Sequence, residues 1–170
     1  MLHIYCGDGK GKTTAAIGLA VRGSGAGMRV RFVQLMKGAH TSELLVLENI
    51  PGLELRRCER DYGFYKGMSG QDKADITRCH NELLEFAFSG DCNKPEMIVL
   101  DEFCAAYAHG LLDNALAERL VLENKDRAEI ILTGRAPAKI FTDAADYISE
   151  INCVRHPYER GVAARKGVEF

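Results

Sequence analysis

The stretch Tyr5–Ala16, YCGDGKGKTTAA, joins a short apolar run to a helical pattern through a loop of glycines and lysines. A strand, a glycine loop and a helix in this order are typical of a phosphate-binding P-loop, whose usual form is G-x-x-x-x-G-K-[ST]. The segment Gly11–Thr13 supplies the end of the motif, but Cys6 occupies the place of its first glycine. The nearest earlier glycine is Gly7, so the loop is one residue short, and it contains an extra lysine, Lys10.

The residue types in this loop suit the binding of a polyphosphate. Glycines let backbone N–H groups approach phosphate oxygens, and the helix that follows directs its positive end at them. Lys12 can bridge phosphates as a point charge, and the Thr13 hydroxyl can ligate Mg²⁺. A glycine-rich turn without a ligand is the alternative, but the strand and helix on either side favour a phosphate site.

Length and composition set the class of protein. A chain of 170 residues suits one compact domain over 1–170, and 46% hydrophobic with 27% charged residues is ordinary for a globular protein. The net charge of −2 predicts no general attraction to nucleic acid or to an anionic membrane. No apolar run approaches the roughly 20 residues of a membrane span. No signal peptide is recognised, so we expect a cytoplasmic protein.

The six cysteines are scattered and form no C-x-x-C pair: Cys6, Cys58, Cys79, Cys92, Cys104 and Cys153. A zinc site or a disulfide framework would need closer or more regular spacing. We therefore expect buried free thiols in a reducing cytosol.

Short apolar runs alternate with helical patterns along the whole chain. The expected strands are Leu2–Cys6, Val30–Leu35, Leu53–Arg57, Met97–Glu102, Glu129–Arg135 and Tyr147–Val154. The expected helices are Thr13–Val21, Ser42–Ile50 and Leu112–Leu122, the first ended by the glycines of GSGAG at 23–27. Ser69 and Asp72 form a weak capping box for a further helix that runs to about Phe88. Strand, crossover helix and strand in repetition predict an α/β fold, with a mostly parallel sheet and helices on both faces, like a P-loop NTPase.

Ligands of such sheets bind beyond the carboxyl ends of the strands. The expected fourth strand ends in Asp101 and Glu102, and the fifth ends in Thr133, Gly134 and Arg135. We expect these ends to meet the glycine-lysine loop in one crevice. The two acids can hold Mg²⁺ directly or through water, or merely cap the next helix. Arg135 can reach phosphate or stay solvated.

Two further segments carry distinctive side chains. The loop 59–70 places Tyr62, Phe64 and Tyr65 between two elements, where aromatic side chains serve as partly buried anchors or face a large flat ligand. The tail Arg155–Gly167 has four cations against one acid, Glu159, and solvated charge is its default interpretation.

Seven segments occur in an order that resembles one family over essentially the whole chain. They are GDGKGKTTAA, VRFVQLMKG, the GF of the aromatic loop, IVLDE, LTGRAP, ADYISE and HPYERGVAARKGVEF. The chain is similar to the ATP:corrinoid adenosyltransferases of the P-loop class, which have a short loop of the form G-N-G-K-G-K-T.

The resemblance implies a reaction that explains the short loop. Members of this family bind ATP in the reverse sense to most P-loop enzymes, and a cobalt(I) corrinoid attacks C5′ of the ribose while intact triphosphate leaves. Extra cations then stabilise the charge of the leaving group. The implied ATP-binding residues are Gly7, Asp8, Gly9, Lys10, Gly11, Lys12, Thr13, Thr14 and Arg135. Mg²⁺ is the implied cofactor, with Thr13, Glu102 and neighbouring Asp101 as its ligands, and Lys12, Thr13 and Glu102 act in catalysis.

The resemblance also implies a redox task. Family members insert aromatic side chains below the corrin ring, which displaces the axial base of cobalt(II) and makes its reduction easier. Phe64 matches the phenylalanine of the family, with Tyr62 and Tyr65 as further corrinoid-binding candidates. The implied partners are ATP, the corrinoid, an electron donor such as a reduced flavoprotein, and a second copy in a homodimer.

This sequence departs from the family at three places. Asp8 stands where the family has asparagine, and an acid there repels triphosphate unless it faces Mg²⁺ or solvent. Lys66 falls where some members have a tryptophan, so Tyr62 or Tyr65 would have to compensate. The sequence begins at its first strand, so we expect it to lack the N-terminal segment that covers the corrinoid cleft in longer members.

Two other functions remain open at this point. One is an ordinary P-loop nucleoside kinase or NTPase, which would need a loop of full length. The other is a carrier that binds nucleotide or corrinoid without catalysis, because Asp8 and Lys66 have removed the activity.

Overall fold

A six-stranded parallel sheet forms the centre of the computed structural model, which describes residues 1–36, 41–90 and 94–168. The strands lie in the order β3-β2-β4-β5-β1-β6, and every neighbouring pair is parallel. Their bounds are β1 Leu2–Cys6, β2 Val30–Gln34, β3 Leu53–Arg57, β4 Met97–Asp101, β5 Glu129–Thr133 and β6 Tyr147–Glu150. All the strands therefore end at one side of the sheet, which we call the carboxyl edge.

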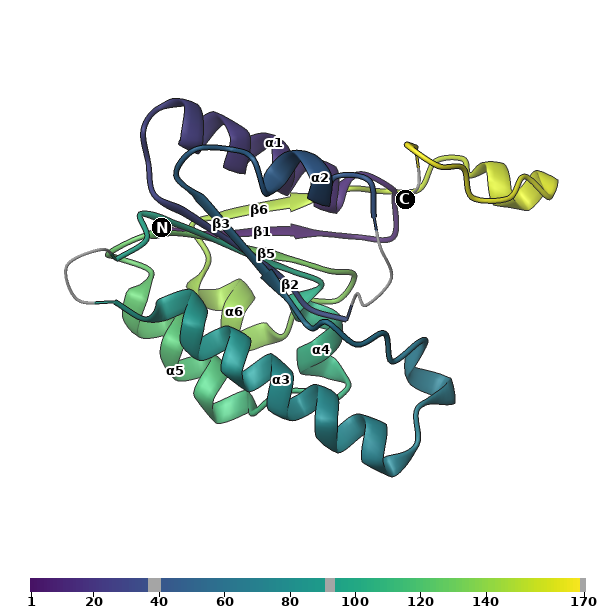
Figure 1. The fold of residues 1–170 in the computed structure, drawn as a ribbon. Helices are drawn as coiled ribbons and strands as arrows, with labels where there is room; N and C mark the ends of the chain where they lie inside the picture. Colours follow the sequence, from purple (N-terminus) through teal and green to yellow (C-terminus); the bar gives the residue numbers. More distant parts are fainter. Residues whose placement is uncertain (37–40, 91–93, 169–170) are drawn as a thin grey trace.

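Helices cover both faces of this sheet (Figure 1). One face carries α1 Lys12–Gly25 and α2 Leu44–Leu47; the other carries α3 Gly70–Phe88, α4 Phe103–Ala108, α5 Asn114–Asn124 and α6 Lys139–Ala144. Two single 3₁₀ turns, Tyr65–Gly67 and Pro157–Arg160, lie outside these layers. The predicted α/β fold is confirmed.

The middle strands of the sheet explain its two-sided core. Every residue of β4 is buried, as expected for a parallel strand with helices on both sides. Ile98 and Leu100 pack in the larger core under α3 to α6, whereas Met97 and Val99 pack against the α1 face. The alternation holds the strand firmly in the sheet, and so fixes the position of Asp101 at its end.

Several element ends differ from the prediction. The helix α1 continues to Gly25, because Gly23 allows close packing: a Cβ there would lie 2.8 Å from Cε of Met97. The last strand ends at Glu150 rather than Val154, because its partner β1 ends opposite it at Cys6. The short helices α4 and α6, of six residues each, were not predicted.

The prediction of free thiols is wrong for one pair of cysteines. Cys58 directly follows β3, Cys79 lies on α3, and the structure joins them in a disulfide with Cα atoms 6.1 Å apart. Their separation of 21 residues carries no recognisable spacing, so only the packing of α3 brings them together. The other described cysteines are free: Cys6, Cys104 and Cys153. Cys92, like Lys37 and Gly38 of the VRFVQLMKG motif and Glu169 and Phe170 of the last motif, lies outside the described residues.

His80 on α3 is fully buried and connects three segments. Its Nε2 accepts a hydrogen bond from the backbone N–H of Met36 at 3.1 Å, so the ring donates from Nδ1 to the carbonyl of Leu111 at 2.6 Å. Burial lowers the pKa of His80 from 6.5 to about 4. The folded protein therefore holds this ring neutral, while the unfolded chain protonates it at higher pH.

This difference predicts a loss of stability in acid. Between pH 6.5 and about 4 the unfolded chain binds the extra proton, so the free energy of unfolding is expected to fall by about 3 kcal/mol across that window. Urea unfolding at pH 7, 5.5 and 4.5 measures the fall, and a His80→Gln variant should lack this part of it. A His80 ring that titrates near pH 6.5 in the folded protein, seen by NMR, contradicts the prediction.

Among the described residues, no helix has the length and apolar character that crossing a membrane requires.

Candidate active site

The carboxyl edge of the sheet opens into a cavity of about 870 Å³, which we call the crevice. Because β5 lies between β4 and β1, the ends of these three strands meet there, as predicted. The predicted residues that line the crevice are Asp8, Gly9, Lys10, Gly11, Lys12, Thr13, Thr14, Glu102 and Arg135. The predicted residues that do not line it are Gly7, Asp101, Tyr62, Phe64 and Tyr65.

The first two glycines of the loop pack against the chain that follows β6. The N–H of Gly7 donates to the carbonyl of Arg135 at 3.2 Å, and the N–H of Gly9 donates to the carbonyl of Ile151 at 2.8 Å. A Cβ on Gly7 would lie 2.4 Å from that Ile151 oxygen, and one on Gly9 would lie 2.7 Å from it. Only glycine fits at these two positions, and their N–H groups are engaged within the protein.

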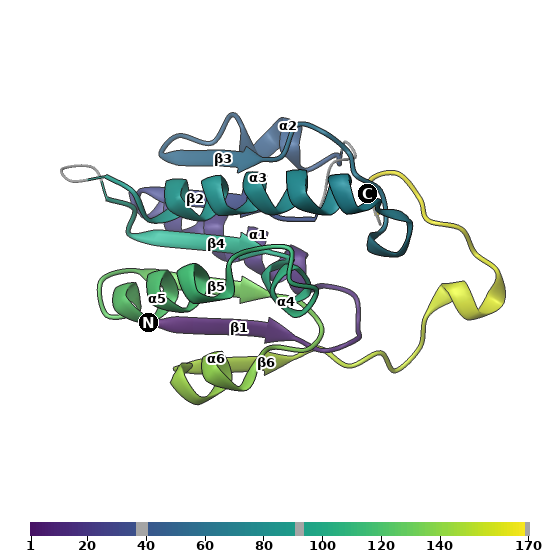
Figure 2. The same ribbon diagram turned by 90° about the horizontal axis from the view of Figure 1, so that it is seen from below.

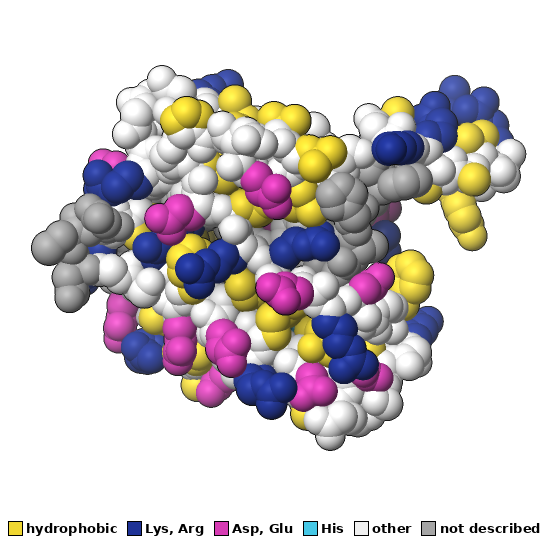
Figure 3. Space-filling view, in the orientation of Figure 1, with side chains coloured by type: hydrophobic (Ala, Val, Ile, Leu, Met, Phe, Trp, Pro, Cys, Tyr) yellow, Lys and Arg dark blue, Asp and Glu magenta, His cyan; other side chains and the backbone are white. Residues whose placement is uncertain are grey.

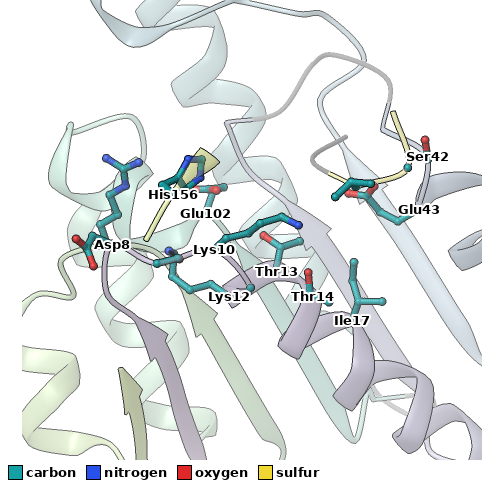
Figure 4. A pocket seen from close by; sticks show the side chains of 15 residues that line it. Asp8, Lys10, Lys12, Thr13, Thr14, Ile17, Ser42, Glu43, Glu102 and His156 are labelled. Atoms are coloured by element: carbon teal, nitrogen blue, oxygen red, sulfur yellow. Dashed lines mark hydrogen bonds between the residues drawn. The ribbon is translucent and has the colours of Figure 1, made fainter. Parts of the chain in front are cut away.

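The start of α1 supplies the N–H groups that face the crevice. Its N-cap is Gly11, with φ 122°, and no described side chain caps the helix or places an acid in its first turn. The first N–H groups of a helix have no partner inside the helix, so an anion at this end can accept from them. The Nζ of Lys12 donates to the carbonyl of Gly9 at 2.7 Å, which holds this ammonium beside the loop. Figure 4 shows Lys10, Lys12, Thr13 and Glu102 around the same hollow.

A buried carboxylate ties the loop to the neighbouring strands. Asp101 is fully buried, and its Oδ1 accepts from the hydroxyls of Thr13 at 2.8 Å and Thr133 at 2.7 Å. The backbone N–H of Glu102 also donates to the Thr133 hydroxyl, at 2.9 Å. Because Thr13 gives its proton to Asp101, the lone pairs of its oxygen remain for a cation in the crevice. Asp101 thus orients Thr13 from behind.

Glu102 directly follows β4 and has a left-handed conformation, with φ 59°. This turn leaves Asp101 in the core and places Glu102 in the wall of the crevice. Among the described residues, no group of three His, Cys, Asp or Glu side chains could hold a metal alone. One carboxylate and one hydroxyl fit Mg²⁺ when phosphate oxygens and water complete the shell, which is the usual way that proteins bind it with nucleotides.

Asp8 has a structural partner that its sequence position did not reveal. Its Oδ1 accepts from the backbone N–H of Cys153 at 3.0 Å, so the acid holds the chain after β6 against the loop. The contact explains how an acid is accommodated beside a phosphate site.

The aromatic loop lies at the carboxyl edge but outside the crevice (Figure 2). Tyr65 stacks on His109 with ring centroids 4.1 Å apart, and Tyr62 packs against the core with Arg60 over its ring. Phe64, in contrast, is 93% exposed. The loop therefore combines two anchored tyrosines with one phenylalanine whose side chain is exposed.

Several residues of the crevice were not predicted: Ile17, Ser42, Glu43, His156, Gly167 and Val168. Helical periodicity could have identified Ile17, which follows Thr13 by one turn of α1. Ser42 and Glu43 precede α2 and carry no recognisable signal. His156 belongs to the basic tail, for which solvated charge was the default interpretation.

Comparison with known proteins identifies the family. Residues 1–170 match the sequence model of the family described as ATP:corrinoid adenosyltransferase BtuR/CobO/CobP. The chain belongs to this family. A corrinoid adenosyltransferase from Pseudomonas aeruginosa is 31% identical over 173 residues, which cover 100% of this chain and 83% of that protein. One from Escherichia coli K12 is 28% identical over 172 residues, which cover 100% and 85%.

Membership of the ATP:corrinoid adenosyltransferase family makes the chain an enzyme that transfers the adenosyl group of ATP to a corrinoid. The alternatives of a kinase or NTPase and of a carrier are not favoured. Among solved structures, EssC (ATPases 2 and 3) from Geobacillus thermodenitrificans matches with a TM-score of 0.54 at 13% identity, over 98% of this chain and 34% of that one. At this identity the match supports only the α/β fold of the chain.

Proposed function

We propose that the crevice holds ATP with its triphosphate on the loop Asp8–Thr14 and its ribose open to a corrinoid at the carboxyl edge. The observation that carries this proposal is the uncapped start of α1, with Lys10 and Lys12 beside it in one cavity. Arg135 lines the same cavity and provides a further cation. Cobalt(I) of the corrinoid attacks C5′, the C5′–O bond breaks with its electron pair going to oxygen, and triphosphate leaves.

The protein's part in this step is to stabilise the leaving triphosphate. Ammonium groups and helix N–H groups that are already in place interact most strongly as negative charge develops, which lowers the barrier. The nucleophile is the cobalt of the substrate, so no side chain has to act as nucleophile or general base. This explains why the crevice contains lysines and a threonine but needs no catalytic histidine or cysteine.

We infer that Thr13 and Glu102 hold Mg²⁺, which when bound would neutralise part of the triphosphate charge. The hydrogen bond from Thr13 to Asp101 supports this role for the hydroxyl oxygen, and the left-handed turn at Glu102 supports it for the carboxylate. We assign Asp101 the role of orienting the Thr13 hydroxyl, because Asp101 is buried behind Thr13 and does not line the crevice.

We infer further that Phe64 acts on the corrinoid before transfer, when cobalt(II) must be reduced. Its exposure at the carboxyl edge supports this role, because a flat ligand would cover it. We assign Tyr62 and Tyr65 the role of holding this loop in position, because both pack against the protein. The family resemblance supports an electron donor such as a reduced flavoprotein, a cytoplasmic location and a homodimer.

Glu102→Ala tests the metal part of the proposal. The variant is expected to form adenosylated corrinoid about tenfold more slowly at saturating Mg²⁺, equal to about 1.4 kcal/mol of barrier. The loss should increase at limiting Mg²⁺, because a ligand of the ion is missing. The measurement follows the adenosylated corrinoid by its absorbance and the triphosphate by chromatography, which should appear in equal amounts.

Glu43→Ala provides the matched control, since Glu43 also lines the crevice but precedes α2. It should leave the Mg²⁺ dependence unchanged. If Glu102→Ala has the rate and the Mg²⁺ dependence of the unmodified enzyme, Glu102 is not the ligand. Release of orthophosphate without a cobalt–carbon bond would reject the placement of ATP altogether.

A further inference from the structure

The segment after β6, residues 151–168, forms an arm that extends from the body of the protein (Figures 1 and 2). Most of it is exposed, and it contains one 3₁₀ turn, Pro157–Arg160. Figure 3 shows Lys and Arg side chains gathered on it. A solvated charged tail would have no fixed relation to the active site, but the root of this arm is held against the phosphate loop.

Contacts of the backbone hold the root of the arm against the phosphate loop. The carbonyl of Ile151 accepts from the N–H of Gly9 at 2.8 Å, and the N–H of Cys153 donates to Oδ1 of Asp8 at 3.0 Å. A Cβ on Gly9 would lie 2.8 Å from the carbonyl carbon of Asn152. The root of the arm and the loop are therefore packed as one unit, and Asp8, the acid that departs from the family pattern, helps to join them.

A second hollow of about 460 Å³ lies between the loop and the arm, and we call it the arm hollow. The charged side chains that line it are Lys10, Arg155 and Arg165, with His156 beside them, and none of the described carboxylates is in its lining. In a chain whose net charge is −2, three cations around one concavity produce a local positive potential. Such a concavity attracts small anions with several charges.

Lys10 and His156 connect this hollow to the crevice, because both residues line both cavities. His156 accepts a hydrogen bond at Nδ1 from the N–H of Tyr158, at 3.2 Å. In the neutral ring the proton is therefore on Nε2, which can donate to an anion. A row of donors and cations thus continues from the loop, past Lys10 and His156, to the two arginines of the arm.

We propose that the arm hollow is a second oxyanion subsite, which takes a phosphate group of the triphosphate chain beside the part that the loop holds. The inference rests on the proposed function in one respect, the placement of triphosphate on the loop. The arm then stabilises the triphosphate both in ATP and as the leaving product. The same oxyanion chemistry could come from a carboxylate at the rim of a corrinoid, and the experiment separates the two sources.

The test compares two double variants that remove the same charge from the same arm. Arg155→Gln/Arg165→Gln changes the hollow, whereas Arg160→Gln/Lys166→Gln changes cations of the arm that do not line it. Calorimetric titration of the full chain with inorganic triphosphate, without corrinoid, gives the dissociation constants. We expect the hollow variant to bind triphosphate at least about tenfold more weakly, and the control variant to change by less than about twofold.

Equal losses in the two variants would mean a general charge effect and would overturn the subsite, as would no loss in either. Lys12→Ala, titrated in the same series, separates this failure from that of the proposed function. If Lys12→Ala loses affinity and the hollow variant does not, the loop holds the triphosphate and the subsite is rejected. If neither loses affinity, the placement of triphosphate on the loop fails as well.

The second part of the test measures KM for corrinoids with and without free carboxylates. A subsite for triphosphate predicts that the hollow variant raises KM for ATP and leaves the ratio of the two corrinoid KM values unchanged. Unchanged binding of triphosphate, with a higher KM only for the corrinoid that has free carboxylates, would overturn the assignment to triphosphate.

Discussion

Lys12→Ala is expected to slow adenosyl transfer about 100- to 1,000-fold, which corresponds to about 2.7–4 kcal/mol of barrier. This is the usual cost of removing one fixed donor from a site where negative charge develops in the transition state. The ammonium of Lys12 is already held beside the loop by the carbonyl of Gly9. No reorganisation is then needed when the C5′–O bond breaks, so the loss should appear mainly in kcat.

The measurement uses single-turnover rates at saturating ATP, starting once from cobalt(I) and once from cobalt(II) corrinoid. Triphosphate must leave in both cases, so the fold loss for Lys12→Ala should be the same. Lys139→Ala is the control, because Lys139 is exposed on α6, where its ammonium pairs with Asp143. A loss below about tenfold in kcat, or a loss only in KM for ATP, would show that Lys12 binds the ground state rather than the transition state.

The parts of the fold that the sequence predicted well are those with a strong local pattern. The strands Leu2–Cys6 and Leu53–Arg57 have the predicted bounds. The helix α3 begins with the predicted capping box of Ser69 and Asp72 and ends at Phe88, as expected. The errors depend on contacts between distant segments. The disulfide of Cys58 and Cys79 is one example, because it follows from where α3 packs.

The predictions for the crevice divide in the same way, into those with a sequence pattern and those that depend on distant contacts. The meeting of the loop, Glu102 and Arg135 follows from the rule that parallel strands share a carboxyl edge, so the sequence could predict it. The bond from Cys153 to Asp8 spans 145 residues and uses a backbone N–H, which has no sequence signature. The sequence also does not show what the N–H of a loop glycine binds. Gly7 matches a phosphate loop, but its N–H donates to the carbonyl of Arg135.

The sequence left two interpretations of the aromatic loop open, and the burial of its side chains bears on the first of them. Tyr62 and Tyr65 are packed on protein, as anchors are, whereas Phe64 is 93% exposed. A core role for Phe64, with the loss of about 3–5 kcal/mol of stability that its removal would cause, is therefore excluded. Phe64→Ala should change the free energy of unfolding by no more than about 0.5 kcal/mol.

The same variant is expected to lose activity in only one of two assays. Burying a fully exposed phenylalanine against the corrin ring supplies about 1.5–3 kcal/mol, which is the energy available to displace the axial base. Starting from cobalt(II) with a weak biological reductant, Phe64→Ala should therefore be about 10- to 150-fold slower. Starting from preformed cobalt(I), which already lacks the base, it should approach the rate of the unmodified enzyme.

Tyr65→Ala is the matched control within the loop. Tyr65 stacks on His109 and lies under Nζ of Lys73, so its removal should lower the melting temperature and disturb the loop as a whole. Phe64→Ala should instead leave the melting temperature unchanged, and it should lower the rate from cobalt(II) much more than the rate from cobalt(I). Equal losses from cobalt(II) and cobalt(I) would reject the redox role, because cobalt(I) no longer needs the base displaced. A rate from cobalt(II) that matches the unmodified enzyme would reject any contact between Phe64 and the corrinoid that matters for reduction.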